Sequence, residues 1–160
     1  MTGSTSAGEG AADQGLAGQA AEAPGSPGRF EIWAPVSFGE LVDKVSILRL
    51  KACFIRDAAK QALVATELAM LLELLDAALR HRDGPDIRAG MAALAAVNRQ
   101  LWEIEDDIRA HDVRQDFGPG FIALARAVYT RNDERAAIKA RLNALFGSQV
   151  VEVKSYGGAA

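Results

Sequence analysis

The sequence predicts an all-α protein, a single-domain bundle of four to five helices with a short extended C-terminal tail. Hydrophobic residues recur every three or four positions through most of residues 37–146, which is the period of an amphipathic helix. Capping residues, glycines and prolines interrupt this pattern where helices would end. Strand-like alternation is weak and confined to QVVEVKSY near the C-terminus. A length of 160 residues suits one domain.

The first 28 residues differ in composition from the rest of the chain. They are rich in glycine, alanine, serine, glutamine and glutamate, and they lack the basic start and apolar run of a secretory signal. Too few large apolar side chains are present to offset the entropy of ordering the segment. We therefore expect a disordered tail over residues 1–28, a helical bundle domain over 29–156 and a flexible end over 157–160.

The first helix is expected from Ser37 to Ile55. Ser37 and Glu40 form an S-x-x-E capping box, in which the glutamate side chain reaches back to the cap. One stripe of the helix is apolar, and an opposite stripe combines an aspartate with apolar residues: Asp43, Ile47, Leu50 and Phe54. A helix with two such faces must be covered on both. It is either the central helix of the bundle or it contacts another subunit.

The second and third helices follow from the same period. Asp57 is the expected N-cap of the second helix, and the turn Asp83-Gly84-Pro85 ends it. The apolar stripe of the second helix is Val64, Leu68, Leu71, Leu75 and Ala78. The third helix is expected from about Asp86 to Ala110, with the apolar positions Ile87, Met91, Leu94, Val97, Leu101, Ile104 and Ile108.

The C-terminal half ends in one or two further helices. The run FGPG at residues 117–120 breaks the chain, and FIALARAVYT and DERAAIKARLNALF then read as two helical segments or one bent helix. Asn132 is the expected cap between them. Gly147 ends the last segment.

Charge and cysteine content exclude several classes of function. A net charge of -3 and a pI near 5.4 give no basic surface for nucleic acid. One cysteine, Cys53, and two histidines offer no metal-binding cluster, so we expect no metal and no cofactor, and a buried Cys53. Apolar runs are shorter than the roughly 18 to 20 residues of a membrane span. We place the protein in the cytoplasm.

Several polar residues fall on faces that should be buried. Asn98 and Glu105 lie on the apolar arc of the third helix, and Asp43 lies on the second stripe of the first helix. A buried carboxylate requires a cation or several hydrogen-bond donors. We expect Arg126 to supply the cation for Asp43, and the alternatives are Lys44, Arg135, Lys139 and Lys154.

These residues have two interpretations. The first is an internal network of ion pairs and hydrogen bonds that fixes how the helices pack. The second is a pocket for a small polar or anionic ligand inside the bundle. The candidate cluster for such a pocket is Asp43, Lys44, Asn98, Glu105, Arg126, Tyr129, Asn132, Arg135, Lys139, Lys154 and Tyr156.

Three motifs resemble those of a family of small bacterial helical domains of unknown function. They are GELVDK, ARxVYxxNDxRAxIK and GSxxxExKSY, and the resemblance extends from about residue 35 to residue 156. The family also occurs beside or fused to glycosyltransferase and tetratricopeptide-type domains, which implies an accessory role in glycan assembly. The resemblance implies no catalytic residues.

Two functions follow from these observations. The first is a non-catalytic accessory or protein-interaction module, with self-association or another protein bound through the helix from Ser37 to Ile55. The alternative is a small-anion or sugar-phosphate binding protein, or an enzyme, built on the polar cluster. A likeness of LVDKVSILRL to a chorismate mutase helix is the weakest form of this alternative. Whether the protein is an enzyme stays open at this point.

Deletion of residues 1–28 should leave the melting temperature nearly unchanged, because a disordered tail makes no contacts that stabilise the domain. Thermal unfolding followed by circular dichroism, on the full chain and on the deletion variant, measures this. A decrease of several degrees in the deletion variant would show that the tail packs against the domain.

Overall fold

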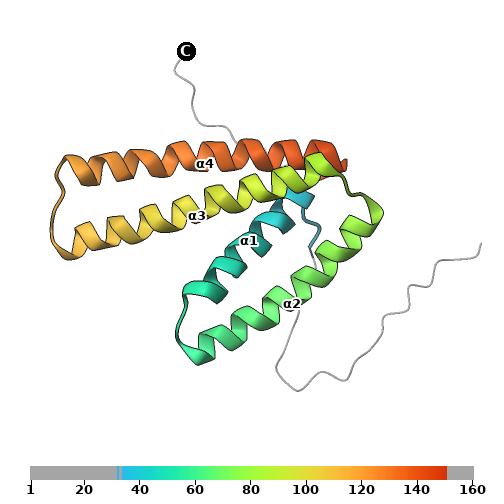
Figure 1. The fold of residues 1–160 in the computed structure, drawn as a ribbon, viewed down its shortest axis with the longest axis horizontal. Coiled ribbons are helices and arrows are strands. Elements are labelled where there is room, and N and C mark those ends of the chain that lie inside the picture. Colours follow the sequence, from blue (N-terminus) through green and yellow to red (C-terminus); the bar gives the residue numbers. More distant parts are fainter. Residues whose placement is uncertain (1–31, 33, 151–160) are drawn as a thin grey trace, which may run out of the picture. The chain divides into compact units, whose positions relative to one another are not determined.

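The structure, a computed structural model, describes residue 32 and residues 34–150, and this part of the chain folds into four helices joined by short turns (Figure 1). No strand occurs within it, which confirms the all-α prediction. The predicted tail over residues 1–28 and the predicted extended segment beyond residue 150 lie outside the described residues. The helices are α1 (Phe38–Phe54), α2 (Ala58–His81), α3 (Pro85–Val113) and α4 (Pro119–Phe146).

The last helix is continuous where the sequence allowed two segments. Asn132 lies inside α4, where its side-chain amide donates to the carbonyl oxygen of Val128, so it is not a helix cap. The helix instead begins after Gly118, with Pro119 in its first turn, and ends at Gly147, whose φ of 80° is left-handed. Glycine adopts this conformation without steric cost, and a left-handed glycine is a common end of an α-helix.

The central helix of the bundle is α1. It packs against α2, α3 and α4, whereas the backbone of α2 comes close to that of α1 alone. Figure 1 shows the result as two helical hairpins, α1–α2 and α3–α4, that diverge from a shared region near the start of α1. The two stripes predicted on α1 are therefore explained by contacts within one chain.

The hydrophobic core lies in this shared region. Eight buried side chains from all four helices form it: Phe38, Leu41, Val42, Val45, Leu75, Ile87, Leu94 and Leu142. Leu94 and Leu142 are completely buried. Burying a side chain of this size stabilises a fold by about 1.5–3 kcal/mol. The core therefore holds the start of α1 against the end of α4.

Residues of α4 and of the turn after it satisfy the first backbone N–H groups of α1. The N–H of Gly39 donates to Oδ1 of Asn143 at 2.7 Å, and the N–H of Phe38 donates to Oγ of Ser148 at 3.0 Å. The first N–H groups of any helix lack partners within that helix. Ser37 accepts from the N–H of Glu40, as the capping box predicts.

The other part of the capping-box prediction, a bond from Glu40 back to the cap, is wrong. The carboxylate of Glu40 does not reach back to the cap but accepts a hydrogen bond from Nζ of Lys139 at 2.6 Å. Lys139 is buried, and a buried ammonium requires a carboxylate partner to offset the free energy of removing it from water. Glu40 and Lys139 therefore join α1 to α4 through an ion pair, in addition to the hydrogen bond between Gly39 and Asn143.

Arg82, at the end of α2, closes the other side of the shared region. Its Nη1 donates to the carbonyl oxygens of Leu145 and Phe146, in the last turn of α4, where a cation is favourable.

The turn between α2 and α3 contains a separate ion pair. The side chain of Arg88 donates to the carboxylate of Asp83, and the backbone N–H of Gly84 donates to it as well. These bonds hold the pKa of Asp83 below its usual value.

Away from the shared region the helices are less covered. Cys53, expected to be buried, is exposed in the last turn of α1, as are its neighbours Ala52 and Phe54. On α2 the stripe predicted to be buried does face inward, with Val64 and Leu75 buried. A separate row of large apolar side chains on α2 is exposed: Leu63 (72%), Met70 (46%) and Leu74 (47%).

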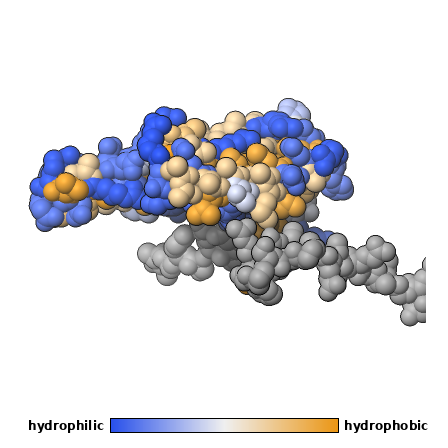
Figure 2. Space-filling view, turned by 90° about the horizontal axis from the view of Figure 1, so that it is seen from below, coloured by the Kyte–Doolittle hydropathy of each residue, from blue (hydrophilic) through white to orange (hydrophobic). Residues whose placement is uncertain are grey.

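Figure 2 shows one face of the molecule, where hydrophobic residues gather over the broader part that contains the α1–α2 hairpin. Hydrophilic residues predominate along the narrower end, where α3 and α4 are joined. Within the described residues, no helix combines the length and the hydrophobicity that crossing a membrane requires.

Gly39→Ala should destabilise the fold by about 1–3 kcal/mol, the usual cost of overpacking. An added Cβ would lie 2.7 Å from the backbone oxygen of Lys139 and 2.9 Å from Oδ1 of Asn143, so α1 and α4 would have to separate. Urea unfolding measures the change. Gly84→Ala is the matched control, because its Cβ would meet no atom within 4 Å, and it should cost less than about 1 kcal/mol. Equal costs for both would contradict the close approach.

Candidate functional site

Asp43 is almost completely buried in the middle of α1, at 1% exposure. Its carboxylate accepts hydrogen bonds from Nε of Arg135 (3.0 Å to Oδ1) and from Nη2 of Arg135 (2.6 Å to Oδ2). A third donor is the side-chain amide of Asn98, at 2.8 Å from Oδ1. Two parallel bonds from one guanidinium are the strongest form of this contact. The buried carboxylate is thus paired, and it joins α1 to both α3 and α4.

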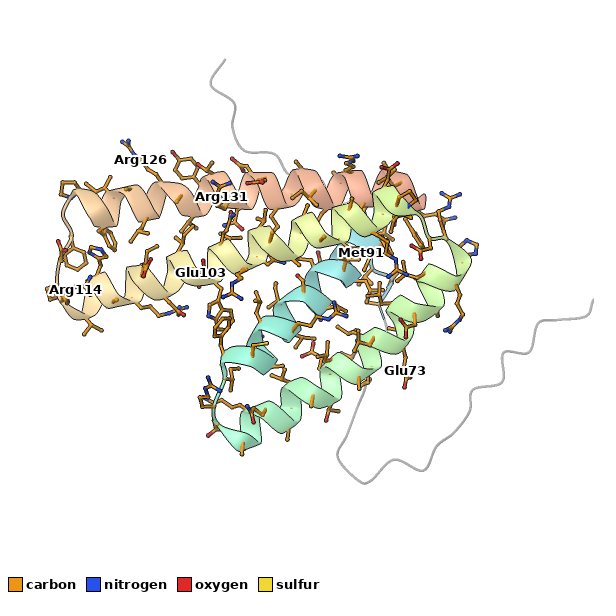
Figure 3. The ribbon with its side chains drawn as sticks, in the orientation of Figure 1. Glu73, Met91, Glu103, Arg114, Arg126 and Arg131 are labelled. Atoms are coloured by element: carbon orange, nitrogen blue, oxygen red, sulfur yellow. The ribbon has the colours of Figure 1, made fainter. Side chains whose placement is uncertain are left out.

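The prediction that Arg126 supplies the cation for Asp43 is wrong. Figure 3 shows Arg126 on the side of α4 that points away from α3, and it is exposed. Arg126 and Arg135 are nine positions apart, which places them about half a turn out of phase on a helix of 3.6 residues per turn. Only one of the two can face α1. Tyr129 is also exposed and lies outside the site.

Two further polar side chains complete the network around Asp43. The amide of Asn98 also donates to Oγ of Ser46, and that hydroxyl donates to the backbone oxygen of Asp43 at 2.8 Å. Asn132 accepts from Nη1 of Arg135 at 3.2 Å. Within the described chain, every buried side-chain nitrogen and oxygen has a partner. Sequence reasoning missed Ser46, although its place one turn after Asp43 was a signal.

A pocket of about 210 Å³ lies beside this network, between α1, α3 and α4. Its apolar wall consists of Ile47, Leu101 and Trp102, and Trp102 stacks on Phe54 with ring centroids 5.5 Å apart. The polar wall comes from α3 and α4: Asn98, Glu105, Arg109, Asn132 and Arg135. Four of these five residues belong to the candidate cluster predicted from the sequence. Arg109 was missed, although it lies eleven positions after Asn98 and therefore on the same side of α3.

Glu105 is not buried, contrary to the prediction. Its side chain is 54% exposed and pairs with Nη2 of Arg109 at 2.9 Å, one turn further along α3. The cause is the length of α1. Phe54, in the last turn of α1, contacts Trp102, and α3 then continues past the end of α1 (Figure 1). A face that is covered at Asn98 is therefore open at Glu105.

The remaining candidate residues lie elsewhere. Lys139 is buried against Glu40, on the same side of α4 as Arg135 but one turn closer to the core. Lys44 is exposed and pairs with Glu67 of α2 at 3.5 Å. Lys154 and Tyr156 lie outside the described residues. The structure thus brings Asp43, Asn98, Asn132 and Arg135 together, adds Glu105 at the edge, and separates Lys44, Arg126 and Tyr129 from them.

The arrangement has two chemical consequences. Asp43, fully occupied by its donors, serves to hold the guanidinium of Arg135 at the pocket wall. Arg109 and Glu105 supply one cation and one carboxylate that are accessible from solvent. Residues 34–150 contain no group of three or more histidine, cysteine, aspartate or glutamate side chains placed to bind a metal ion.

Arg135→Gln should destabilise the fold by ~3 to 5 kcal/mol, because it leaves the carboxylate of Asp43 buried without a cation. Asp43→Asn should cost less, about 1–3 kcal/mol, because the guanidinium that loses this carboxylate is partly exposed to water. Chemical denaturation of the two single variants and the double variant measures these costs. The double variant should lose less stability than the sum of the two, which indicates direct coupling.

Arg126→Gln is the control for this cycle, and it should change stability by less than about 0.5 kcal/mol, since the residue is exposed. Additive losses below about 1 kcal/mol for Asp43→Asn and Arg135→Gln would contradict a buried, coupled pair.

Comparison with known proteins identifies the family. No curated protein and no solved structure matches the chain. A family of unknown function (DUF6165) matches residues 32–159, which include all four helices, the buried network and the pocket. Because the match covers most of the 160 residues, the chain belongs to this family of unknown function.

Proposed function

We propose that the protein is a non-catalytic interaction module and that the exposed row of Leu63, Met70 and Leu74 on α2 is its binding surface. The observation that supports this proposal is the position of α2. Among the described helices, only α1 has its backbone close to that of α2, and the side of α2 that carries Leu63, Met70 and Leu74 is exposed. Large apolar side chains at this exposure, aligned along one side of a helix, are typical of a protein-binding surface.

The first partner of this surface is a second copy of the chain. Leu63 and Leu74 are eleven positions apart, about three helical turns, and therefore lie on one side of α2. In an antiparallel pair of α2 helices related by a two-fold axis near residues 68–69, Leu63 of each copy is opposite Leu74 of the other. Met70 lies close to the axis, where its flexible thioether fills irregular space.

This proposal replaces α1 as the binding helix. The two stripes of α1 suggested self-association through the segment from Ser37 to Ile55, but contacts with three other helices account for them. The accessory role in glycan assembly rests on the sequence resemblance alone. In that role, the apolar side of α2 would be free in a monomer to bind a helix of a neighbouring domain.

The full chain should have about twice its 17.0 kDa mass in light scattering at ~100 μM, and dilution should lower that mass, as mass action requires. Leu63→Glu combined with Leu74→Glu should give a monomer, because both Leu63–Leu74 contacts of the pair would bring two negative charges together. Circular dichroism should show unchanged helix content, since both positions are exposed.

Ile122→Glu is the matched control. Ile122 has 50% exposure, similar to that of Leu74, but lies near the α3–α4 turn, so this variant should keep the mass of the parent chain. A strict monomer at the highest concentration, or equal loss of association in the α2 variant and the Ile122 variant, would contradict self-association through α2.

A further inference from the structure

We infer that a second cavity, between α1, α2 and α3, binds a small monocarboxylic acid with an apolar body, and that Arg49 binds its carboxylate. The cavity measures about 240 Å³. None of its lining residues belongs to the exposed row of α2 or to the polar cluster predicted from the sequence. The proposal rests on the apolar wall of this cavity and on the state of the few polar groups in it.

Most of the wall of the second cavity is apolar. Six apolar residues from three helices line it: Val42, Val45, Leu75, Met91, Ala92 and Ala95. Val42, Val45 and Leu75 are almost completely buried, whereas Ala92 and Ala95, on the opposite side, are exposed. Met91 lies where α3 passes close to α1 (Figure 3). An apolar ligand body would remove the surface of the two alanines from water, which favours binding.

The hydroxyl of Ser46, one of three polar side chains in this wall, already has partners. It donates to the backbone oxygen of Asp43 and accepts from the side-chain amide of Asn98. Both bonds belong to the buried network that holds α1 in place. Ser46 therefore completes the wall without requiring a polar group from a ligand.

The two arginines of the wall differ in their surroundings. Arg88 donates to the carboxylate of Asp83, and this bond, with a smaller contribution from the charge of Asp76, raises the pKa of Arg88. Arg49 is exposed and forms neither an ion pair nor a side-chain hydrogen bond with any residue that the structure describes. The guanidinium of Arg49 is therefore the cation of this wall that is available to a ligand.

This combination selects the chemical class of the ligand. A guanidinium binds a carboxylate through two parallel hydrogen bonds, and one such group matches one negative charge. A phosphate dianion would require further donors, and the wall has none to spare. The volume is below the roughly 300–1,000 Å³ of sites for larger ligands, which limits the apolar body to a short chain or a single ring.

The test uses the full chain, with ¹³C-methyl methionine and NMR detection. Met91 lines the second cavity, and Met70 belongs to the exposed row of α2, so their signals separate binding in the cavity from binding to α2. Spectra of Met91→Leu and Met70→Leu assign the two signals. Hexanoate and 3-phenylpropanoate are titrated to ~10 mM, a range that detects even millimolar dissociation constants. The amides of the two acids, which lack the charge, and inorganic phosphate, which lacks the apolar body, are titrated in parallel.

At least one acid should shift the Met91 signal and bind at least about tenfold more tightly than its own amide or phosphate. Arg49→Gln should weaken binding of that acid about tenfold and leave binding of the amide unchanged, because only the carboxylate loses its partner. Arg49→Lys should lie between the two, since an ammonium keeps the charge but not the two parallel bonds. Arg56→Gln is the matched control: Arg56 is exposed just after α1 but does not line the cavity, so the affinity should stay the same.

Four results would overturn the proposal. No shift of Met91 with either acid would exclude the site, and shifts of Met70 alone would place the acids on α2. Equal binding of the acid and its amide, or unchanged affinity in Arg49→Gln, would show that Arg49 does not bind the carboxylate. Tighter binding of phosphate would show a site for inorganic anions. None of these results depends on the mass measured by light scattering, so they leave self-association through α2 to its own test.

Discussion

The bond between Asp43 and Arg135 is the constraint on which the arrangement of the helices depends. A carboxylate in the interior of α1 must face a donor, and the donors come from α3 and α4 at the same point along α1. This requirement fixes the rotation of α1 about its axis. Once that rotation is set, Leu41, Val42 and Val45 face the core and Gly39 comes against α4. Apolar packing alone would tolerate neighbouring rotations, whereas two directed bonds to one guanidinium do not.

Local signals explain what the sequence predicted well. Helix caps, turn residues and the period of apolar positions lie within a few residues of each other, so most helix ends followed from them, and the central position of α1 was one of the two alternatives that they left open. The need for a buried cation partner for Asp43 was also predictable, because it depends on α1 alone. The identity of the partner was not, because Arg126 and Arg135 lie on opposite sides of α4 and only the contact between helices selects one.

Glu105 shows a second limit of sequence reasoning. The helical period places it on the same face as Asn98, and that placement is correct, yet one side chain is buried and the other exposed. Burial depends on how far the neighbouring helix extends, which is a property of α1 and of the angle between the hairpins. The same mismatch in helix length creates the pocket, since a covered face and an open face meet there. Network and pocket therefore share Asn98, Asn132 and Arg135, and a ligand in the pocket would contact the residues that hold α1 in place.

The hydrogen bonds at the start of α1 also bear on synthesis of the chain. Their acceptors, Asn143 and Ser148, are 104 and 110 residues downstream of the N–H groups they satisfy. A ribosome adds about 5–20 residues per second, so the first helix leaves the exit tunnel well before its partners have been made. Until then its N–H groups bond water, and Asp43 lacks its arginine. The nascent domain therefore completes its native fold only after the last helix has emerged, and a chain stalled before α4 would expose the apolar faces of α1.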